Sequence, residues 1–159
     1  MESSSYGSRR VSPDGIYNQV SYELKNHKNT ISVSRPTSRL QWGIRVPGDD
    51  QQTIYVWLDA LVNYLTVLGY PAQSENLDNQ IRETTHIIGK DIAKFHCIYY
   101  PFFLLGAGLA LPDRVLSHGH WLKDNKKMSK SLGNVTDPFE LLNEFGSASL
   151  RTYFLAEGP

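Results

Sequence analysis

Apolar residues recur three and four positions apart along much of the chain, which is the spacing of one face of an α-helix. This pattern predicts helices over residues 17–26, 53–70, 92–111, 138–145 and 148–157. Gly69 is the stop signal of the second helix, and Asp91 is expected to cap the third, which should bend at Pro101. Gly146 separates the last two helices.

Shorter stretches with alternating or continuous apolar residues predict β-strands between these helices. Residues 29–50 predict one strand followed by glycine- and proline-rich loops, and buried strands are expected over 85–91 and 114–122. Because strands that alternate with helices pair in parallel through helical crossovers, the expected fold class is α/β. Only two or three core strands are predicted, whereas a complete doubly wound sheet has about five or six.

Composition narrows the classes of protein further. The chain has 159 residues, 40% of them hydrophobic and 20% charged, with sixteen basic and sixteen acidic residues. Net charge therefore gives no argument for a protein that coats nucleic acid, any contact with a polyanion should be local, and DNA is not an expected partner. The single cysteine, Cys97, excludes an internal disulfide and a four-thiolate zinc site, and no zinc is expected. The sequence contains no charge-free apolar run of about 18 residues, so no membrane span is predicted. Residues 1–15 are expected to form a disordered leader.

Three lysines crowd the segment "KKMSKSLGN" that follows the predicted strand 114–122. Lys127 and Lys130 are three residues apart and could present two ammonium groups to the phosphates of a nucleotide, with Ser129 and Ser131 adding hydroxyls. Such cations stabilise the charge that gathers on a departing pyrophosphate. A dense lysine cluster is also typical of an ordinary solvated loop, and the pattern alone leaves both readings open.

A second candidate site lies on the predicted helix 53–70. One face carries residues at i, i+3, i+4 and i+7, namely Trp57, Ala60, Leu61 and Tyr64. The small Ala60 leaves a slot between two rings, and a thioether such as that of methionine favours aromatic edges. His96 and Tyr100, one turn apart on the next helix, could close this slot. An aromatic stripe at this spacing is also typical of an ordinary core.

Four blocks in order support a family resemblance: "SVSRPTSRLQWGIRVPGDD", "YVWLDALVNYLT", "HIIGKDIAKFHCIYYP" and "HGHWLKDNKKMSKSLGN". KMSKS is the second signature of class I aminoacyl-tRNA synthetases, and from Ile31 onward the chain resembles the methionyl-tRNA synthetases of bacterial and mitochondrial type. The resemblance implies that residues 16–159 form the second half of a Rossmann-type catalytic domain, with an incomplete parallel sheet. Residues 16–30 would then be a remnant of the connective region, and the anticodon-binding domain would be absent.

The resemblance also implies roles for individual residues. It places Arg35, Trp57, Ala60, Tyr64, His96 and Tyr100 at the methionine pocket. It places Gly89, Asp91, Lys127, Met128, Ser129, Lys130 and Ser131 at the ATP site, with Lys127 and Lys130 as the catalytic pair. Without the resemblance, Arg35 reads as a surface cation and Asp91 as a helix cap, a role compatible with ribose binding.

Some patterns point away from a function or depart from the family. "SHGH" is not the family's first signature, His-x-Gly-His, because Ser117 stands at its first position. His118 and His120 lack a third ligand nearby in sequence, so no metal site is expected. Tyr100 replaces a common tryptophan and Arg45 an expected proline.

The resemblance implies a methionine-tRNA ligase that uses ATP with Mg²⁺, forms methionyl-adenylate and transfers methionine to initiator and elongator tRNA(Met). The isolated chain is expected to have little activity, because the His-x-Gly-His half of the site is missing. The expected compartment is the mitochondrial matrix, with the cytoplasm as the alternative. Another reading is a non-catalytic binding or regulatory module derived from the same fold. A synthetase for another apolar amino acid is a further alternative.

Overall fold

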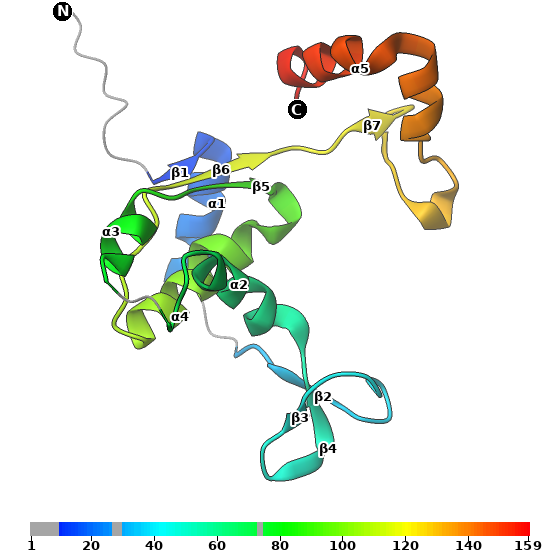
Figure 1. Cartoon of the computed structure of the whole chain (residues 1–159). Helices are drawn as coiled ribbons and strands as arrows, with labels where there is room; N and C mark the ends of the chain where they lie inside the picture. Colours follow the sequence, from blue (N-terminus) through cyan, green and yellow to red (C-terminus); the bar gives the residue numbers. More distant parts are fainter. Residues whose placement is uncertain (1–9, 27–29, 73–74) are drawn as a thin grey trace, which may run out of the picture.

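A three-stranded parallel sheet forms the centre of the molecule (Figure 1), in a computed structural model that describes residues 10–26, 30–72 and 75–159. The strands lie in the order β1 (Val11–Ser12), β6 (Arg114–His118) and β5 (Thr85–Gly89). Ile87 pairs with Leu116 in the register of β5 and β6. The mixed α/β class with parallel strands and an incomplete sheet is therefore confirmed.

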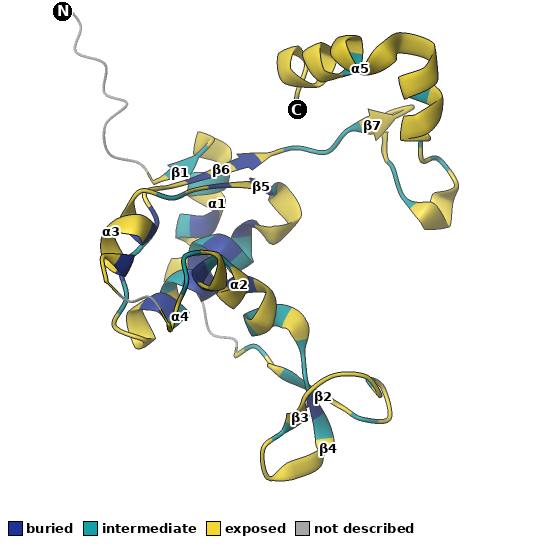
Figure 2. Ribbon diagram, viewed as in Figure 1, coloured by how far each residue is buried: buried dark blue, intermediate teal, exposed yellow. Residues whose placement is uncertain are grey.

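Among the described residues, helices cover one face of this sheet and leave the other uncovered (Figure 2). The inward side chains of β5 and β6, His86, Ile88, Val115 and Ser117, are buried. On the other face Ile87 is 70% exposed and Leu116 is 41% exposed. We call this second surface the bare face. A doubly wound sheet is covered on both faces, so the bare face is the side that further helices would cover.

Four helices make up most of the covering layer: α1 (Asp14–Lys25), α2 (Val56–Val67), α3 (Leu77–Arg82) and α4 (Tyr100–Gly106). Buried apolar side chains of α2, α3 and α4, with that of Ala110, form the larger core cluster. Its members are Leu61, Leu65, Leu77, Ile81, Tyr100, Leu104 and Ala110. In the described ranges, none of the helices combines the length and apolarity needed to cross a membrane.

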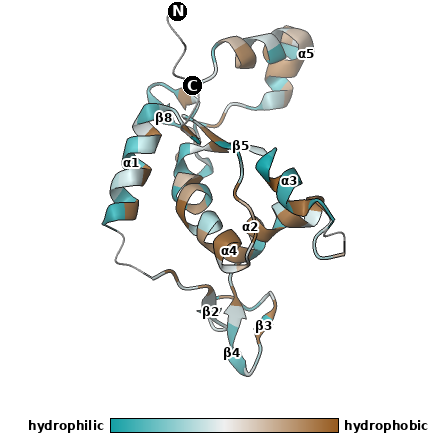
Figure 3. Cartoon of the chain, turned by 90° about the vertical axis from the view of Figure 1, so that its left-hand side faces the viewer, coloured by the Kyte–Doolittle hydropathy of each residue, from teal (hydrophilic) through white to brown (hydrophobic). Residues whose placement is uncertain are grey.

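The segment before α2 forms a separate small antiparallel sheet rather than the expected single strand and loops (Figure 3). Its strands are β2 (Ser34–Pro36), β3 (Arg45–Val46) and β4 (Asp49–Ile54), in the order β2-β4-β3. Thr53 is fully buried there, and its hydroxyl is satisfied by a hydrogen bond donated to the Leu40 carbonyl oxygen at 2.8 Å. A buried polar residue breaks the alternating pattern, which explains why the sequence predicts only one strand.

The lysine-rich segment is also more ordered than expected. The strand predicted over 114–122 ends at His118, and a hairpin of β7 (Leu122–Lys123) and β8 (Lys126–Lys127) follows. A 3₁₀ turn over Lys130–Leu132 leads to α5 (Pro138–Ala156). Gly146 breaks α5 with φ of 75°, as the sequence predicts.

Two further expectations need correction. Asp91 is not the N-cap of a helix, since it lies inside a 3₁₀ turn, Lys90–Ile92. The helix that follows is a π-helix over Phe95–Tyr99, which becomes the α-helical α4 next to Pro101.

The predicted leader, residues 1–15, is only partly outside the described residues. Residues 1–9 lie outside them, whereas residues 10–15 contribute β1 and the start of α1. Val11 pairs with Val115, so this part of the expected leader is an integral strand of the sheet.

Candidate functional site

Aromatic and histidine rings from α2, β5, the π-helix Phe95–Tyr99 and α4 meet in one place. Tyr64 of α2 lies 4.4 Å from His86 of β5 and 5.7 Å from Tyr100 of α4, measured between ring centroids. The Tyr64 hydroxyl is 2.8 Å from His96 Nε2. We call these four residues the ring cluster. The structure thus brings together Tyr64, His96 and Tyr100, as the sequence predicts, and adds His86.

The hydrogen bonds of His96 determine which atom of the ring cluster donates. His96 Nδ1 is 3.0 Å from the carbonyl oxygen of Ile92, and a carbonyl can only accept. Nδ1 therefore carries the proton of a neutral ring, which leaves Nε2 to accept from the Tyr64 hydroxyl. The Tyr64 hydroxyl therefore donates its hydrogen bond to His96, and its oxygen can still accept one from another group.

Burial keeps these rings uncharged near neutral pH. It lowers the pKa values of both His86 and His96, and the charge of His96 lowers that of His86 further. Burial likewise raises the pKa of Tyr64 and raises that of Tyr100 to about 12. The ring cluster is thus a neutral, polarizable surface with a few fixed hydrogen-bonding groups.

A row of rings runs from the small antiparallel sheet to the π-helix that carries His96. Trp57 stacks on Phe95 with centroids 4.1 Å apart, and Tyr55 meets Trp57 edge-on at 5.2 Å. The Arg35 guanidinium lies 4.5 Å from the centroid of the Tyr55 ring, a distance typical of a cation–π contact. Ala60, on the α2 face between Trp57 and Tyr64, is exposed. The predicted slot is therefore open to solvent at its smallest residue.

The carboxyl end of β5 carries the other predicted residues. Gly89 is extended, with φ of −72°, and an added Cβ would meet only His118 Cε1 at 4.0 Å. The fold itself therefore does not require glycine at this position. A ligand that approaches the backbone closely would still favour glycine at this position.

Asp91, two residues further on, receives two basic groups on one carboxylate oxygen. His120 Nε2 lies 2.9 Å from Asp91 Oδ2, and Lys127 Nζ donates to the same oxygen. The Lys127 hydrogen bond has the largest effect and lowers the pKa of the Asp91 carboxyl. Desolvation opposes this shift, and the hydrogen bond and charge of His120 lower the pKa further. This contact joins the lysine segment to the stretch that leads into His96.

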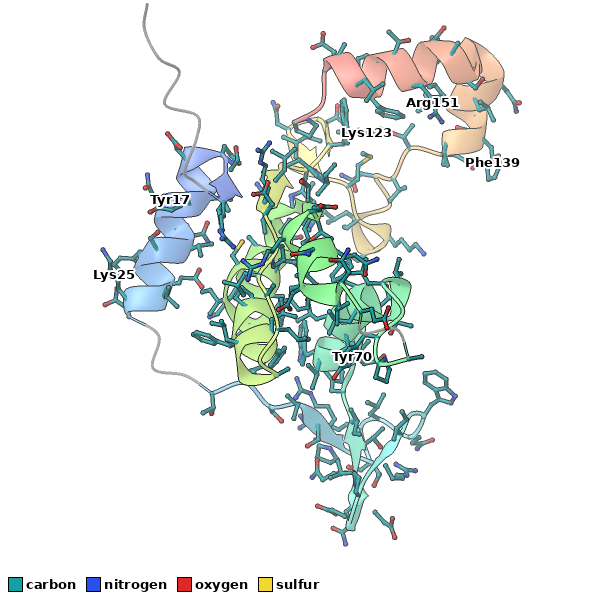
Figure 4. All side chains as sticks on the ribbon, turned by 60° about the vertical axis from the view of Figure 1, so that its left-hand side comes forward. Tyr17, Lys25, Tyr70, Lys123, Phe139 and Arg151 are labelled. Atoms are coloured by element: carbon teal, nitrogen blue, oxygen red, sulfur yellow. The ribbon has the colours of Figure 1, made fainter. Side chains whose placement is uncertain are left out.

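The lysine segment itself is folded by its own polar side chains (Figure 4, where Lys123 marks the hairpin). Asn134 accepts from the Ser129 backbone N–H at 2.9 Å and donates to the Lys127 carbonyl at 3.3 Å. The hydroxyls of Ser129 and Ser131 are 3.2 Å apart. Lys130 is exposed and forms no ion pair with any residue in the described part of the chain, so its ammonium group is available to a ligand. Met128 is half-buried between the two lysines.

A separate apolar hollow of about 440 Å³ lies between α2 and α4. It is lined by Leu58, Val62 and Leu65, on a different face of α2 from Trp57 and Tyr64. Of the predicted site residues, only Tyr100 borders it. The hollow is therefore not the predicted slot.

The family model described as tRNA synthetases class I (M) matches residues 4–159. The chain belongs to this family. Its match begins within the expected leader, in agreement with the place of β1 in the sheet.

Relatives narrow the likeness to one synthetase within the family. The chain is 53% identical over 150 residues to the probable mitochondrial methionine--tRNA ligase of Schizosaccharomyces pombe, and 52% identical over 148 residues to the mitochondrial methionine--tRNA ligase of Homo sapiens. Each match covers 93% of this chain, but only 28% and 25% of the relative. The chain thus spans about a quarter of the length of these curated relatives.

A solved structure agrees with these sequence matches. The Mycobacterium tuberculosis methionyl-tRNA synthetase in complex with methionyl-adenylate superposes with a TM-score of 0.79 at 38% identity, over 91% of this chain and 28% of that chain. The fold expected from the resemblance, part of a class I tRNA synthetase catalytic domain, is therefore confirmed.

The sequence pattern does not indicate the contacts that three residues of this class I synthetase segment make. His86 was missed, although strand alternation places it on the same side of β5 as the buried Ile88. The sequence does not indicate a metal site at His120, and it gives no sign of the contact that His120 makes with Asp91. Asn134 was read only as part of the lysine string, although it holds two backbone groups of that string.

Proposed function

We propose that this chain is the second half of the Rossmann-type catalytic domain of a methionine-tRNA ligase, comprising residues 16–159. The whole enzyme would activate methionine with ATP to methionyl-adenylate, release pyrophosphate and transfer methionine to initiator and elongator tRNA(Met). The contact between Lys127 and Asp91 carries this proposal, because it joins the lysine segment to the stretch that leads into the ring cluster. The named relatives support the same activity.

In this proposal the ring cluster and its neighbours receive the methionine side chain. Tyr64 and His96 offer neutral, oriented polar groups, and Trp57 with Tyr100 offers aromatic surface to the thioether. Ala60 leaves room between the rings. Arg35, held over Tyr55, supplies a positive charge at the edge of the same row of rings, suited to a carboxylate or to the adenylate.

The nucleotide would lie at the carboxyl end of β5, where ligands bind in open α/β sheets. Gly89 allows close approach to the backbone, and Asp91 would accept hydrogen bonds from the ribose hydroxyls. Lys127 and Lys130 would stabilise charge on the departing pyrophosphate, with Met128, Ser129 and Ser131 shaping the loop. Mg²⁺ would enter with the triphosphate as part of the substrate.

Several coarser expectations complete the proposal. We assign the protein to the mitochondrial matrix, because the relatives named above are mitochondrial enzymes. Residues 16–30, most of them in α1, are proposed to derive from the connective region. The isolated chain should show little activity, since the sequence holds no His-x-Gly-His and the sheet has a bare face.

A chimera tests the proposed activity. The aligned 150 residues of the Schizosaccharomyces pombe relative, which are 53% identical, would be replaced by those of this chain, and methionine-dependent ATP–pyrophosphate exchange measured. We expect exchange by the chimera and essentially none by the isolated chain. Lys127→Ala and Lys130→Ala should each lower the rate by about 10²–10³-fold, the effect of removing one electrostatic donor.

Lys126→Ala is the matched control, because Lys126 is an exposed lysine of the same hairpin that is assigned no role at the phosphates. It should change the rate by less than about threefold. A folded chimera without exchange would refute the proposal. Robust exchange by the isolated 159 residues would instead refute the claim that the site is incomplete.

The alternative is a non-catalytic docking or regulatory module that retains the fold. The bare face supports this reading, because Ile87 and Leu116 are exposed on it and could contact a partner. A chain that docks but does not catalyse would give an inactive chimera even though the ring cluster remains intact.

A further inference from the structure

Two side chains from separate segments converge on the Asp91 carboxylate. His120 follows the end of β6, Lys127 belongs to β8, and both contact the same oxygen, Oδ2. The side chains of Asp91 and Lys127 are 56% and 55% exposed, whereas that of His120 is only 19% exposed. The histidine is therefore the fixed member of the group.

The surroundings of His120 fix the direction of its donor. Its Nδ1 is buried and has no hydrogen-bond partner among the residues that the structure describes. Its Nε2 faces Asp91 Oδ2, and because an ionised carboxylate can only accept, Nε2 donates to Asp91.

Asp91 has a second oxygen whose role differs. Every hydrogen bond to the Asp91 carboxylate within the described ranges falls on Oδ2, so Oδ1 is left for a ligand. A carboxylate held through one oxygen has the other oriented, and a ribose presents two neighbouring hydroxyl donors. The orientation of Oδ1 therefore depends on which group holds Oδ2.

Lys127 cannot hold Oδ2 throughout the proposed reaction. Its single ammonium group contacts Asp91 in this structure, whereas pyrophosphate release requires it at the phosphates. Pairs between exposed charges are weak and exchange readily, so the lysine can leave. When it leaves, the His120 hydrogen bond is the one that the structure retains on Asp91.

We propose that His120 is a positioning residue of the nucleotide site, which holds Oδ2 of Asp91 so that Oδ1 stays oriented toward the ribose after Lys127 moves to the phosphates. This inference rests on the proposed function and deepens it, because it assigns the ribose contact to a donor–carboxylate pair. A ring that served packing alone would need no donor at Nε2. The proposal therefore predicts that the donor, and not the ring, is required.

The experiment measures the dissociation constants of AMP and of 2′,3′-dideoxy-AMP by NMR titration of the 159-residue chain carrying Lys127→Ala, because AMP lacks the phosphates that would draw Lys127 away from Asp91. With His120 present in this background, we expect AMP to bind at least about tenfold more tightly than the dideoxy probe, as hydrogen bonds to a charged group imply. His120→Phe, which keeps a ring but loses the donor, should reduce this ratio to about threefold or less. His120→Gln, whose amide nitrogen matches the Nε2 position, should restore most of it.

Each result decides the matter. An unchanged ratio in His120→Phe, with a melting temperature close to that of the Lys127→Ala chain, would overturn the positioning role and leave the proposed function standing. No AMP binding by the Lys127→Ala chain would overturn the role as well, and the exchange activity of the chimera would show whether the proposed function fails with it. Should His120→Phe not fold, His120→Asn replaces it, because its amide is too short to reach Asp91.

Discussion

The hydrogen bond between Tyr64 and His96 is the most direct link between the fold and the proposed methionine pocket. Replacing Tyr64 by Phe removes the hydroxyl and keeps the ring, so the contacts with His86 and Tyr100 remain. The variant therefore isolates one interaction, the 2.8 Å bond to His96 Nε2.

The cost follows from what remains unpaired in the variant. His96 is 5% exposed, and its Nδ1 proton is committed to the Ile92 carbonyl. Nε2 would be left as a buried acceptor without a donor, which costs about 1–3 kcal/mol. For a domain of this size each kcal/mol lowers the melting temperature by about 2–4 °C.

Urea denaturation followed by fluorescence measures this difference, with Tyr100→Phe as the matched control. Tyr100 is 3% exposed and lies in the same ring cluster, but its hydroxyl has no hydrogen bond to any residue within the described ranges. We expect a change below about 0.5 kcal/mol for the control. A double-mutant cycle with His96→Leu should give a coupling energy above about 0.5 kcal/mol. Equal stability of the two Tyr→Phe variants, without coupling, would refute the assigned donor and tautomer.

Three further outcomes are expected. Acidification below about pH 6.5 should lower the free energy of unfolding, because the unfolded chain protonates His86 and His96 while burial holds their folded pKa values lower; a flat urea midpoint from about pH 7 to 5 would contradict this. Gly43→Ala should destabilise the chain by about 1–3 kcal/mol in the same assay, since φ is +139° and the new Cβ would lie 2.7 Å from Thr53 Cγ2. The exposed apolar residues of the bare face should make the chain self-associate, and Ile87→Lys should reduce this association in sedimentation without loss of stability. Unchanged association in the variant would show that the bare face is not the contact surface.

Helices were the part of the fold that the sequence predicted best. Their apolar periodicity is a local property, and α1, α2 and the broken α5 lie within three residues of the expected starts. The break in α5 was also predictable, because Gly146 adopts a positive φ that other residues rarely adopt.

Short strands escaped prediction because two residues are too few to show a periodic pattern. β1 has two residues and pairs with β6 about a hundred positions later in the chain, so no local pattern reveals it. The β7–β8 hairpin is equally short, and its turn at Asp124 and Asn125 uses positive φ at both residues. Asn and Asp tolerate that conformation better than most residues, a signal that could have been read.

The site shows the same division between local and distant information. The α2 face and the family resemblance together identified Tyr64 and His96, and the structure brings them within hydrogen-bonding distance. The contact of His120 with Asp91 has no local signal in the sequence, where His120 stands beside His118 and far from Asp91. The carboxyl ends of the parallel strands β5 and β6 meet at one edge, which brings His120 to Asp91.

Titration of the chain with a sulfamoyl analogue of methionyl-adenylate, compared with the leucyl analogue, tests the central claim most directly. If the ring cluster and the lysine segment form one site, the methionyl analogue should bind at least about tenfold more tightly and alter the fluorescence of Trp57. The same affinity for both analogues, or no binding of either, would contradict the account.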